Sequence, residues 1–202
     1  SENVQSYYKK YNKLKKSEES AIEQLEKNSD ELEYLNSVLT NIENCESYTE
    51  IDDIKEELIS TGYVRKRKAN GKNNKKAKPS KPLHYISSDG IDIFVGKNNI
   101  QNDNLSLKFA NKNHMWLHTK NIPGSHVIVC SNDVPDNTLV EAATLAAYYS
   151  KAKESSKVDV DYTLVKNLKK PNGAKPGMVI YHTNYTMTVD PSDIKSLNLE
   201  KK

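Results

Sequence analysis

The sequence predicts an α+β protein in which a long coiled-coil helix and a short second helix precede a compact α+β domain. Three observations predict this arrangement. Apolar residues recur every seven positions within the first 43 residues, which is typical of a coiled-coil helix. From residue 84 onward, short apolar runs alternate with turn residues, which favours a mostly antiparallel or mixed sheet with about two helices. A lysine-rich stretch with almost no apolar residues separates the two parts.

Residues 3–43 are predicted to form one long helix, because no Gly or Pro interrupts them and their apolar residues follow a heptad pattern. At 1.5 Å per residue this helix extends ~60 Å. Asn28 occupies a polar position in the apolar stripe, where such a residue can set the register of a coiled coil. The stripe cannot bury itself, so a partner helix is expected upstream in a longer protein. Its apolar positions are Leu25, Leu32, Leu35, Leu39 and Ile42.

A shorter helix is predicted at 49–60, with Thr49 as its N-cap, acidic residues in its first turn and Gly62 as its stop signal. Residues 1–62 are therefore expected to form a coiled-coil helical segment. Charge is unevenly distributed along the chain. Residues 18–57 hold fourteen Asp or Glu and two Lys, although the whole chain carries a net charge of +3.

Residues 63–81 are predicted to form a flexible basic linker. Its residues 65–81 hold nine Lys or Arg, no acid and almost nothing that could be buried. A basic run favours a polyanion such as RNA as its partner, and the alternative is a tether that only adds solubility. The predicted RNA contacts of the linker are Arg65, Lys66, Arg67 and Lys68.

Residues 82–195 are predicted to form the α+β domain, and residues 196–202 a tail. The first two strands flank the turn Ser88-Asp89-Gly90, which indicates a β-hairpin. A Pro-Gly loop lies between the next two strands. The strands are expected at 84–87, 91–95, 114–118, 126–130, 158–165, 178–182 and 185–189.

Two helices are predicted within this domain. The first is short and is expected at about 103–110, with its cap near Asn102. The second is expected to begin at a capping box formed by Thr138 and Glu141 and to end near residue 153. Small alanine side chains on one face of this second helix would allow it to pack closely against a sheet.

No pattern in the sequence predicts catalysis, a metal or a cofactor. The sequence contains no G-x-S-x-G elbow, no P-loop, no G-x-G-x-x-G turn and no evident pair of acid–base carboxylates. Candidate zinc ligands are spaced too loosely for the short-range pairs typical of zinc sites. These candidates are His114, His118, His126 and Cys130. The two cysteines are expected to be free thiols, and no apolar run approaches the ~20 residues needed to span a membrane.

Three loops carry the residue types that bind RNA: cations for phosphate, backbone amides and planar groups for stacking. The loops are 96–103, 118–126 and 166–177, and we expect them to converge on one surface. The alternatives are ordinary surface turns with solvated lysines, and a core position for Trp116. The predicted RNA-binding residues are Lys97, Asn98, Trp116, His118, Lys120, Gly124, Ser125, His126, Lys169, Lys170 and Lys175.

Seven short motifs occur in a characteristic order from residue 96 onward. They are Gly96-Lys97-Asn98, Gln101-Asn102-Asp103, Trp116-x-His118, Pro123-Gly124-Ser125-His126-Val127, Glu141-Ala142-Ala143, Asp161-Tyr162-Thr163 and Gly173-Ala174-Lys175-Pro176-Gly177. Together they resemble the NFACT-R domain of the NFACT family over about residues 84–193. The run from Tyr8 resembles the coiled-coil segment of that family more weakly. One departure is His114, which stands where the family usually has an acidic residue.

The NFACT family includes bacterial ribosome-associated quality-control factors and proteins called fibronectin-binding protein A. The resemblance implies that the full-length protein acts in the cytoplasm on a large ribosomal subunit (50S) that carries an obstructed nascent chain and a tRNA. It also implies support for C-terminal alanine tailing of that chain. The present chain would then be a noncatalytic part that binds rRNA and tRNA. The alternative, raised by the family's other name, is an adhesin at the cell surface that binds fibronectin.

Overall fold

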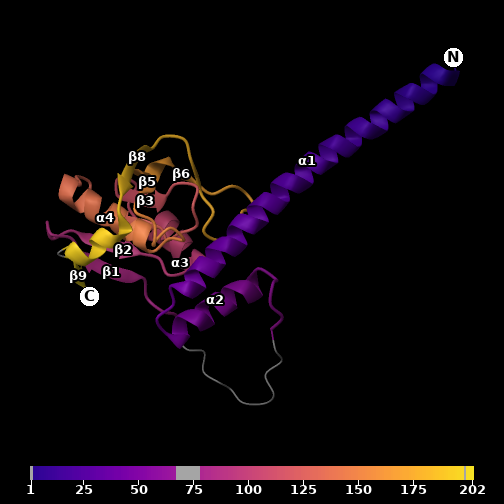
Figure 1. Ribbon diagram of the computed structural model, residues 1–202. Coiled ribbons are helices and arrows are strands. Elements are labelled where there is room, and N and C mark those ends of the chain that lie inside the picture. The colour runs from indigo at the N-terminus through magenta and orange to yellow at the C-terminus, as the bar shows by residue number, and fades with distance from the viewer. Residues whose placement is uncertain (1, 67–77, 198) are drawn as a thin grey trace, which may run out of the picture. The chain divides into compact units, whose positions relative to one another are not determined.

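The computed structural model describes residues 2–66, 78–197 and 199–202 (Figure 1). The chain forms two compact units, Ser1–Leu35 and Asn36–Lys202. The first unit contains most of helix α1, and the second contains the end of α1 and the elements that follow it. The predicted α+β class is confirmed, because a long helix precedes an antiparallel sheet and a few helices.

Helix α1 (Glu2–Glu43) has 42 residues and runs without a break through the predicted coiled-coil segment. Its heptad residues are exposed to solvent, with Leu25 at 68% and Leu32 at 63% exposure. An exposed apolar stripe of this kind is typical of a helix that packs against another helix. The upstream partner helix remains a prediction. No helix in the described part of the chain is long and apolar enough to cross a membrane.

Helix α2 (Tyr48–Ser60) begins one residue earlier than expected. The predicted N-cap Thr49 is wrong: Ser47 takes that position, and its side chain accepts a hydrogen bond from the backbone N–H of Glu50. Gly62 follows the helix with a φ of 86°, as a glycine stop signal should. The buried face of α2 carries Glu50, Ile54 and Glu57, so two of its three buried side chains are acidic.

The main sheet has seven strands in the order β8-β5-β3-β4-β2-β1-β9, and all neighbours are antiparallel. The predicted hairpin is present, with the turn ending at Gly90 (φ 78°). Residues 200–201, within the predicted tail, pair with β1 as the last strand. The strands are β1 (Leu83–Ile86), β2 (Asp92–Val95), β3 (Met115–Thr119), β4 (Val127–Val129), β5 (Val158–Leu164), β8 (Tyr185–Val189) and β9 (Glu200–Lys201).

A separate two-stranded sheet pairs β6 (Leu168–Lys169) with β7 (Ile180–Tyr181). The strand predicted at 178–182 forms as β7. It pairs with β6, on the other side of the loop 170–179, and not with β8, which follows it in the sequence. Two short 3₁₀ turns complete the domain: η2 (Val165–Asn167) lies between β5 and β6, and η3 (Pro191–Ser196) lies between β8 and β9.

The helix predicted at 103–110 begins earlier and changes type partway along. Helix α3 (Asn99–Asn104) is capped by Asn98, whose Oδ1 accepts a hydrogen bond from Gln101 N at 2.8 Å. A π-helical turn, η1 (Leu105–Phe109), continues it. The expected cap near Asn102 is wrong, because the Asn102 side chain instead accepts from the backbone N–H of His126.

Helix α4 (Asp136–Tyr148) lacks the capping box that the sequence suggests. Its N-cap is Pro135, which makes no side-chain cap. Thr138 Oγ1 donates instead to Ser87 Oγ at 2.9 Å. Glu141 accepts from the backbone N–H of Ser88 at 3.0 Å. Both residues thus fix the helix to the β1–β2 hairpin rather than to its own first turn.

The two faces of the main sheet are covered differently. One face packs against α4, whose Ala142, Ala143, Ala146 and Ala147 are fully buried against strands β2 to β5. The absence of bulky side chains on that helix face permits close approach to the sheet. The other face is covered by α3, η1 and the β6–β7 pair through a smaller core. That core consists of Leu105, Trp116, Ile128 and Leu168.

Candidate nucleic-acid interface

Two of the three predicted loops meet at the start of β4. The backbone N–H of Gly96 donates to the carbonyl oxygen of His126 at 3.1 Å. The backbone N–H of His126 donates to Asn102 Oδ1, also at 3.1 Å. A Cβ added at Gly96 would lie 2.1 Å from Asn102 Oδ1. Glycine is therefore required at position 96 for this contact between loops 96–103 and 118–126.

The third loop joins them through Asp103. Lys170 Nζ forms an ion pair with one oxygen of Asp103, and the backbone N–H of Gly177 donates to the other at 3.1 Å. Gly177 has a φ of 82°, and a Cβ there would lie 2.6 Å from Asn99 Oδ1. The three loops therefore contact one another, but they do so through buried residues and internal ion pairs. That they form one cationic surface for RNA stays a prediction.

Five of the predicted contact residues are buried where the loops meet. Asn98 caps α3, and Trp116 lies in the smaller core with 1% exposure. Gly124 forms an isolated β-bridge with Ser150, and a Cβ on it would lie 2.8 Å from Thr119 Oγ1. The backbone N–H of Ser125 donates to the carbonyl of Tyr149. With His126, these residues organise the loops rather than present groups to solvent.

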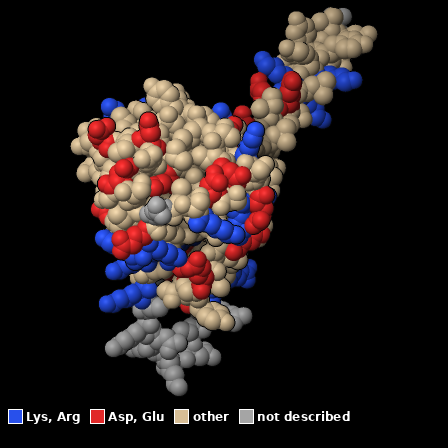
Figure 2. Space-filling view, turned by 60° about the vertical axis from the view of Figure 1, so that its left-hand side comes forward, with Lys and Arg blue, Asp and Glu red and all other residues tan. Residues whose placement is uncertain are grey.

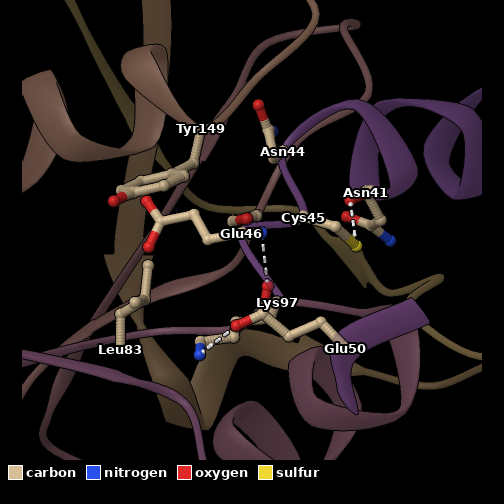
Figure 3. A pocket seen from close by; sticks show the side chains of 10 residues that line it. Asn41, Asn44, Cys45, Glu46, Glu50, Leu83, Lys97 and Tyr149 are labelled. Carbon is tan, nitrogen blue, oxygen red and sulfur yellow. Dashed lines mark hydrogen bonds and ion pairs between the residues drawn. The ribbon is translucent and has the colours of Figure 1, made fainter. Parts of the chain in front are cut away.

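Several predicted cations make internal contacts. Lys97 Nζ lies 2.6 Å from Glu50 Oε1 on α2, as Figure 3 shows. Burial would raise the pKa of Glu50, but hydrogen bonds from Lys97 and the backbone lower it overall. Lys175 Nζ lies 4.8 Å from the centroid of the Tyr63 ring, a cation–π contact. Lys120 and Lys169 are exposed.

Figure 3 also shows the small cavity beside this ion pair. It lies next to the free thiol of Cys45 and has a volume of about 20 Å³. That volume is close to the space of one water molecule, so it cannot accept a nucleotide. Burial raises the pKa of the Cys45 thiol, and its Sγ donates to the carbonyl of Asn41 at 3.2 Å. The cavity is therefore a packing gap beside a structural contact.

The two predicted histidines belong to an aromatic cluster around Trp116. The centroid of the Trp116 ring lies 5.7 Å from that of His118, 5.2 Å from that of His126 and 5.0 Å from that of Tyr181. His126 Nδ1 lies 2.8 Å from Ser106 Oγ, which is itself buried. The Ser106–His126 hydrogen bond therefore lies inside the domain and ties η1 to the start of β4.

Burial controls the charge of both histidines. It lowers the pKa of His118 to about 4. It also lowers the pKa of His126 well below the usual value, and the neighbouring His118 adds to that shift. Both rings are therefore neutral at pH 7 and cannot neutralise a phosphate as cations.

We expect the fold to lose stability as the pH falls from about 6.5 to 4. In that window the unfolded chain binds protons at these histidines, whereas the folded chain does not. Because His118 is half-buried, we expect it to contribute about 1 kcal/mol between pH 6.5 and 5. Urea unfolding at pH 7, 6 and 5 measures the effect, and His118→Gln should flatten it. An unchanged pH dependence in that variant would contradict the assignment.

A group of exposed lysines lies at the other end of β3. Lys166 and Lys169 of this group lie in the predicted loop 166–177, whereas Lys108 and Lys112 lie outside the three predicted loops. The backbone N–H of Lys166 donates to the carbonyl of Lys112 at 3.0 Å, which joins the segment after η1 to the segment after β5. Leu105 and Leu168 pack together beneath them. We call Lys108, Lys112, Lys166 and Lys169 the lysine group; all four are exposed.

The sequence holds a signal for this group. Residues 104–132 contain no Asp or Glu, and neither do residues 162–189. Antiparallel pairing of β3 with β5 brings the two acid-free segments side by side. Figure 2 shows one face of the molecule, on which acidic and basic side chains both occur. Within the linker, Arg65 and Lys66 are exposed, whereas Arg67 and Lys68 lie outside the described residues.

Among the described residues, no group of three or more His, Cys, Asp or Glu is placed to hold a metal ion. Cys130 is a free thiol, and burial raises its pKa to about 11. His114 contacts the side-chain amide of Asn111 near the lysine group, and burial lowers its pKa.

Comparison with protein-family models gives two matches. Residues 81–183 match the NFACT protein RNA binding domain, and residues 1–77 match the NFACT N-terminal and middle domains. The chain belongs to the NFACT family. The boundary between the two matches lies near residue 80, where the basic stretch ends and β1 follows.

Curated NFACT relatives resemble this chain over its whole length. It is 44% identical over 203 residues to the Rqc2 homolog RqcH of Bacillus subtilis, covering 100% of this chain and 35% of the relative. It is 45% identical over 203 residues to the Rqc2 homolog RqcH of Streptococcus suis, covering 98% of this chain and 36% of the relative. The chain therefore spans about a third of the length of the curated relatives it matches.

A solved structure shares the fold. It is the C-terminal part of the fibronectin/fibrinogen-binding protein from Streptococcus suis, with a TM-score of 0.87 and 44% identity. The match covers 96% of this NFACT chain and 78% of that structure. A shorter similarity, 35% over 106 residues, links the chain to the coiled-coil domain-containing protein 25 homolog of Dictyostelium discoideum and covers 48% of each.

Proposed function

We propose that this chain is the RNA- and ribosome-binding part of an NFACT ribosome quality-control factor. The observation that carries the proposal is the match of residues 81–183 to the NFACT RNA-binding domain. The identity of 44% to the Rqc2 homolog RqcH along the whole chain supports a role in quality control. Within this proposal the chain acts without catalysis, in the cytoplasm, by holding RNA.

The finer proposal concerns the partners of the full-length protein. It would bind the rRNA of the large (50S) subunit that carries an obstructed nascent chain, contact tRNA and support alanine tailing of that chain. The exposed apolar stripe of α1 would pack against a helix from the upstream part of the protein. We propose the segment 1–62, the linker 63–81 and the domain that begins at residue 82 as its working parts. Residues 200–201 of the predicted tail pair with β1, so they count with the domain rather than with a separate tail.

We propose the lysine group as the main phosphate contact of the domain. Four exposed ammonium groups on two acid-free segments can neutralise phosphates along an RNA strand. The exposed linker cations Arg65 and Lys66, together with Lys120, would add further contacts. The buried predicted residues would act indirectly, by fixing the loops that carry these lysines.

We expect Lys112→Gln with Lys166→Gln to weaken binding to rRNA or tRNA roughly tenfold and to lower the salt slope by about 2. Fluorescence anisotropy against KCl concentration measures both quantities. The matched control is Lys153→Gln with Lys157→Gln, which removes two exposed lysines after α4. Equal losses in the two double variants would show that the lysine group is not a specific contact.

The alternative is a surface-exposed protein that binds fibronectin. The observation that favours it is the name of the similar Streptococcus suis structure. Three measurements separate the two functions: sedimentation with 50S subunits, binding to immobilised fibronectin, and cell fractionation. Binding to fibronectin with no ribosome association would overturn the proposed role.

A further inference from the structure

A groove lies between α2 and the α3–η1 segment, and it plays no part in the proposed RNA contact. Its volume is about 870 Å³. Phe94, Ile100, Leu105 and Phe109 form its apolar lining, and Pro79 and Pro82 add a wall from the segment before β1. We call this feature the α2 groove.

Two of the four apolar side chains of the α2 groove are exposed to solvent. Phe109 is 53% exposed and Ile100 is 38% exposed. The rings of Phe94 and Phe109 meet edge to face with centroids 5.0 Å apart, which holds Phe109 in place. Leu105 extends the same surface into the smaller core. Exposed aromatic and aliphatic side chains gathered in one concave site are typical of a binding surface.

The backbone of η1 explains how this surface forms. The backbone N–H of Ala110 donates to the carbonyl of Leu105 at 2.9 Å, the wider spacing of a π-helical turn. Leu105 and Phe109 line the groove, while Ser106 of the same turn is buried against His126. Single π-helical turns are uncommon and often occur at functional sites.

The rim of the groove is acidic. Asp52, Asp53 and Glu56 on α2 line it, and Lys55 is the single cation among the described lining residues. These four charged residues give the lining a net charge of −2. This field repels phosphate and attracts lysine or arginine. An RNA strand is therefore a poor occupant, and a basic segment is a good one.

Two side chains that line the groove already bind the backbone of the segment before β1, at Ser80. Asp53 Oδ2 accepts a hydrogen bond from the backbone N–H of Ser80 at 2.8 Å. Gln101 Nε2 donates to the carbonyl oxygen of Ser80 at 2.9 Å. Side chains on both walls therefore bind a main-chain donor and a main-chain acceptor of a non-helical segment. The exposed amide of Asn104 adds a further polar group to the lining.

We propose that the α2 groove binds a short peptide segment of a partner protein, with large apolar anchors flanked by Lys or Arg. The anchors would pack on Phe109 and Ile100, and the flanking cations would face the acidic rim. Such a site would bind a peptide through its apolar side chains and would favour peptides with positive charges beside them, because the rim is acidic. This interaction is separate from the RNA contact at the lysine group.

The test is selection from a phage-displayed library of random peptides against the whole chain. Selected peptides are then synthesised, labelled and measured by fluorescence anisotropy. We expect enrichment of Lys or Arg beside Leu, Phe or Trp. Phe109→Ser should weaken their binding at least tenfold, and Asp52→Lys with Glu56→Lys should weaken it about fivefold and reduce its dependence on salt.

Leu107→Ser is the matched control, since Leu107 is 39% exposed but does not line the groove. It should change peptide binding less than twofold. Circular dichroism checks that each variant is folded, and RNA affinity should be the same in Phe109→Ser as in the original chain. Selection of acidic peptides, or of peptides insensitive to Phe109→Ser, would overturn the proposal. Self-association that Phe109→Ser abolishes would overturn it too, by assigning the groove to a second copy.

Discussion

Trp116→Ala is expected to lower the free energy of unfolding by about 4 kcal/mol. Trp116 is 1% exposed and packs with Leu105, Ile128 and Leu168 beneath η1 and the β6–β7 pair. Alanine would leave a cavity the size of an indole, which the rigid sheet cannot fill. Urea unfolding followed by circular dichroism measures the loss, because the chain contains one Trp and its fluorescence disappears with the substitution.

Trp116→Phe is the matched control for this prediction. Phenylalanine keeps an aromatic ring in the core, and it removes an indole Nε1 that has no hydrogen-bond partner among the described residues. We therefore expect a loss below about 2 kcal/mol. If Trp116 stacked on RNA bases instead, Trp116→Ala would abolish RNA binding while the free energy of unfolding stayed nearly constant. That outcome would contradict the core assignment.

Glu57→Ala is expected to lower the free energy of unfolding by about 3 kcal/mol. The Glu57 side chain is fully buried on α2. Its Oε2 accepts from the backbone N–H of Asn99 at 3.2 Å, and its Oε1 accepts from Asn99 Nδ2 at 3.0 Å. Alanine would leave the backbone N–H of Asn99 buried without this acceptor and would leave Asn99 Nδ2 with Ser37 Oγ alone, so α2 would lose two hydrogen bonds to the start of α3.

Two further measurements test the role of Glu57. Glu57→Gln keeps one carbonyl acceptor, so we expect it to cost roughly half as much as Glu57→Ala. Hydrogen exchange at the amides of residues 99–101 should speed up in both variants, because their helix start is released. Glu18→Ala on the exposed part of α1 is the control and should leave both quantities unchanged. Rapid exchange in that control would indicate a general rather than local effect.

Periodicity and turn residues predicted much of the fold. The uninterrupted heptads predicted α1, and Ser88-Asp89-Gly90 predicted the first hairpin. Helix starts were less accurate, because residues suited to capping serve other partners here. Thr138 and Glu141 bind the β1–β2 hairpin, and their partners lie about fifty residues away in the sequence. A local pattern cannot reveal that such a side chain has a distant partner.

The site shows the same limit for charged residues. The three predicted loops do contact one another, but residue type and loop position could not show which of their residues would be buried and which lysines would pair with acids. Lys97 pairs with Glu50, and Lys170 pairs with Asp103, each across more than forty residues. Only the tertiary fold decides those pairings. The two acid-free segments were visible in the sequence, and they indicate the lysine group because β3 and β5 are neighbours.

The short strand β9 has a consequence for how the sheet meets other molecules. An unprotected edge strand exposes backbone N–H and C=O groups with which a strand of another molecule can pair, and such pairing leads to aggregation. β9 pairs with Tyr85 and Ile86 of β1 and presents only two residues, Glu200 and Lys201, at the border of the sheet. A border this short and this charged discourages pairing with a strand of another molecule, so this edge of the sheet is protected against edge-to-edge association.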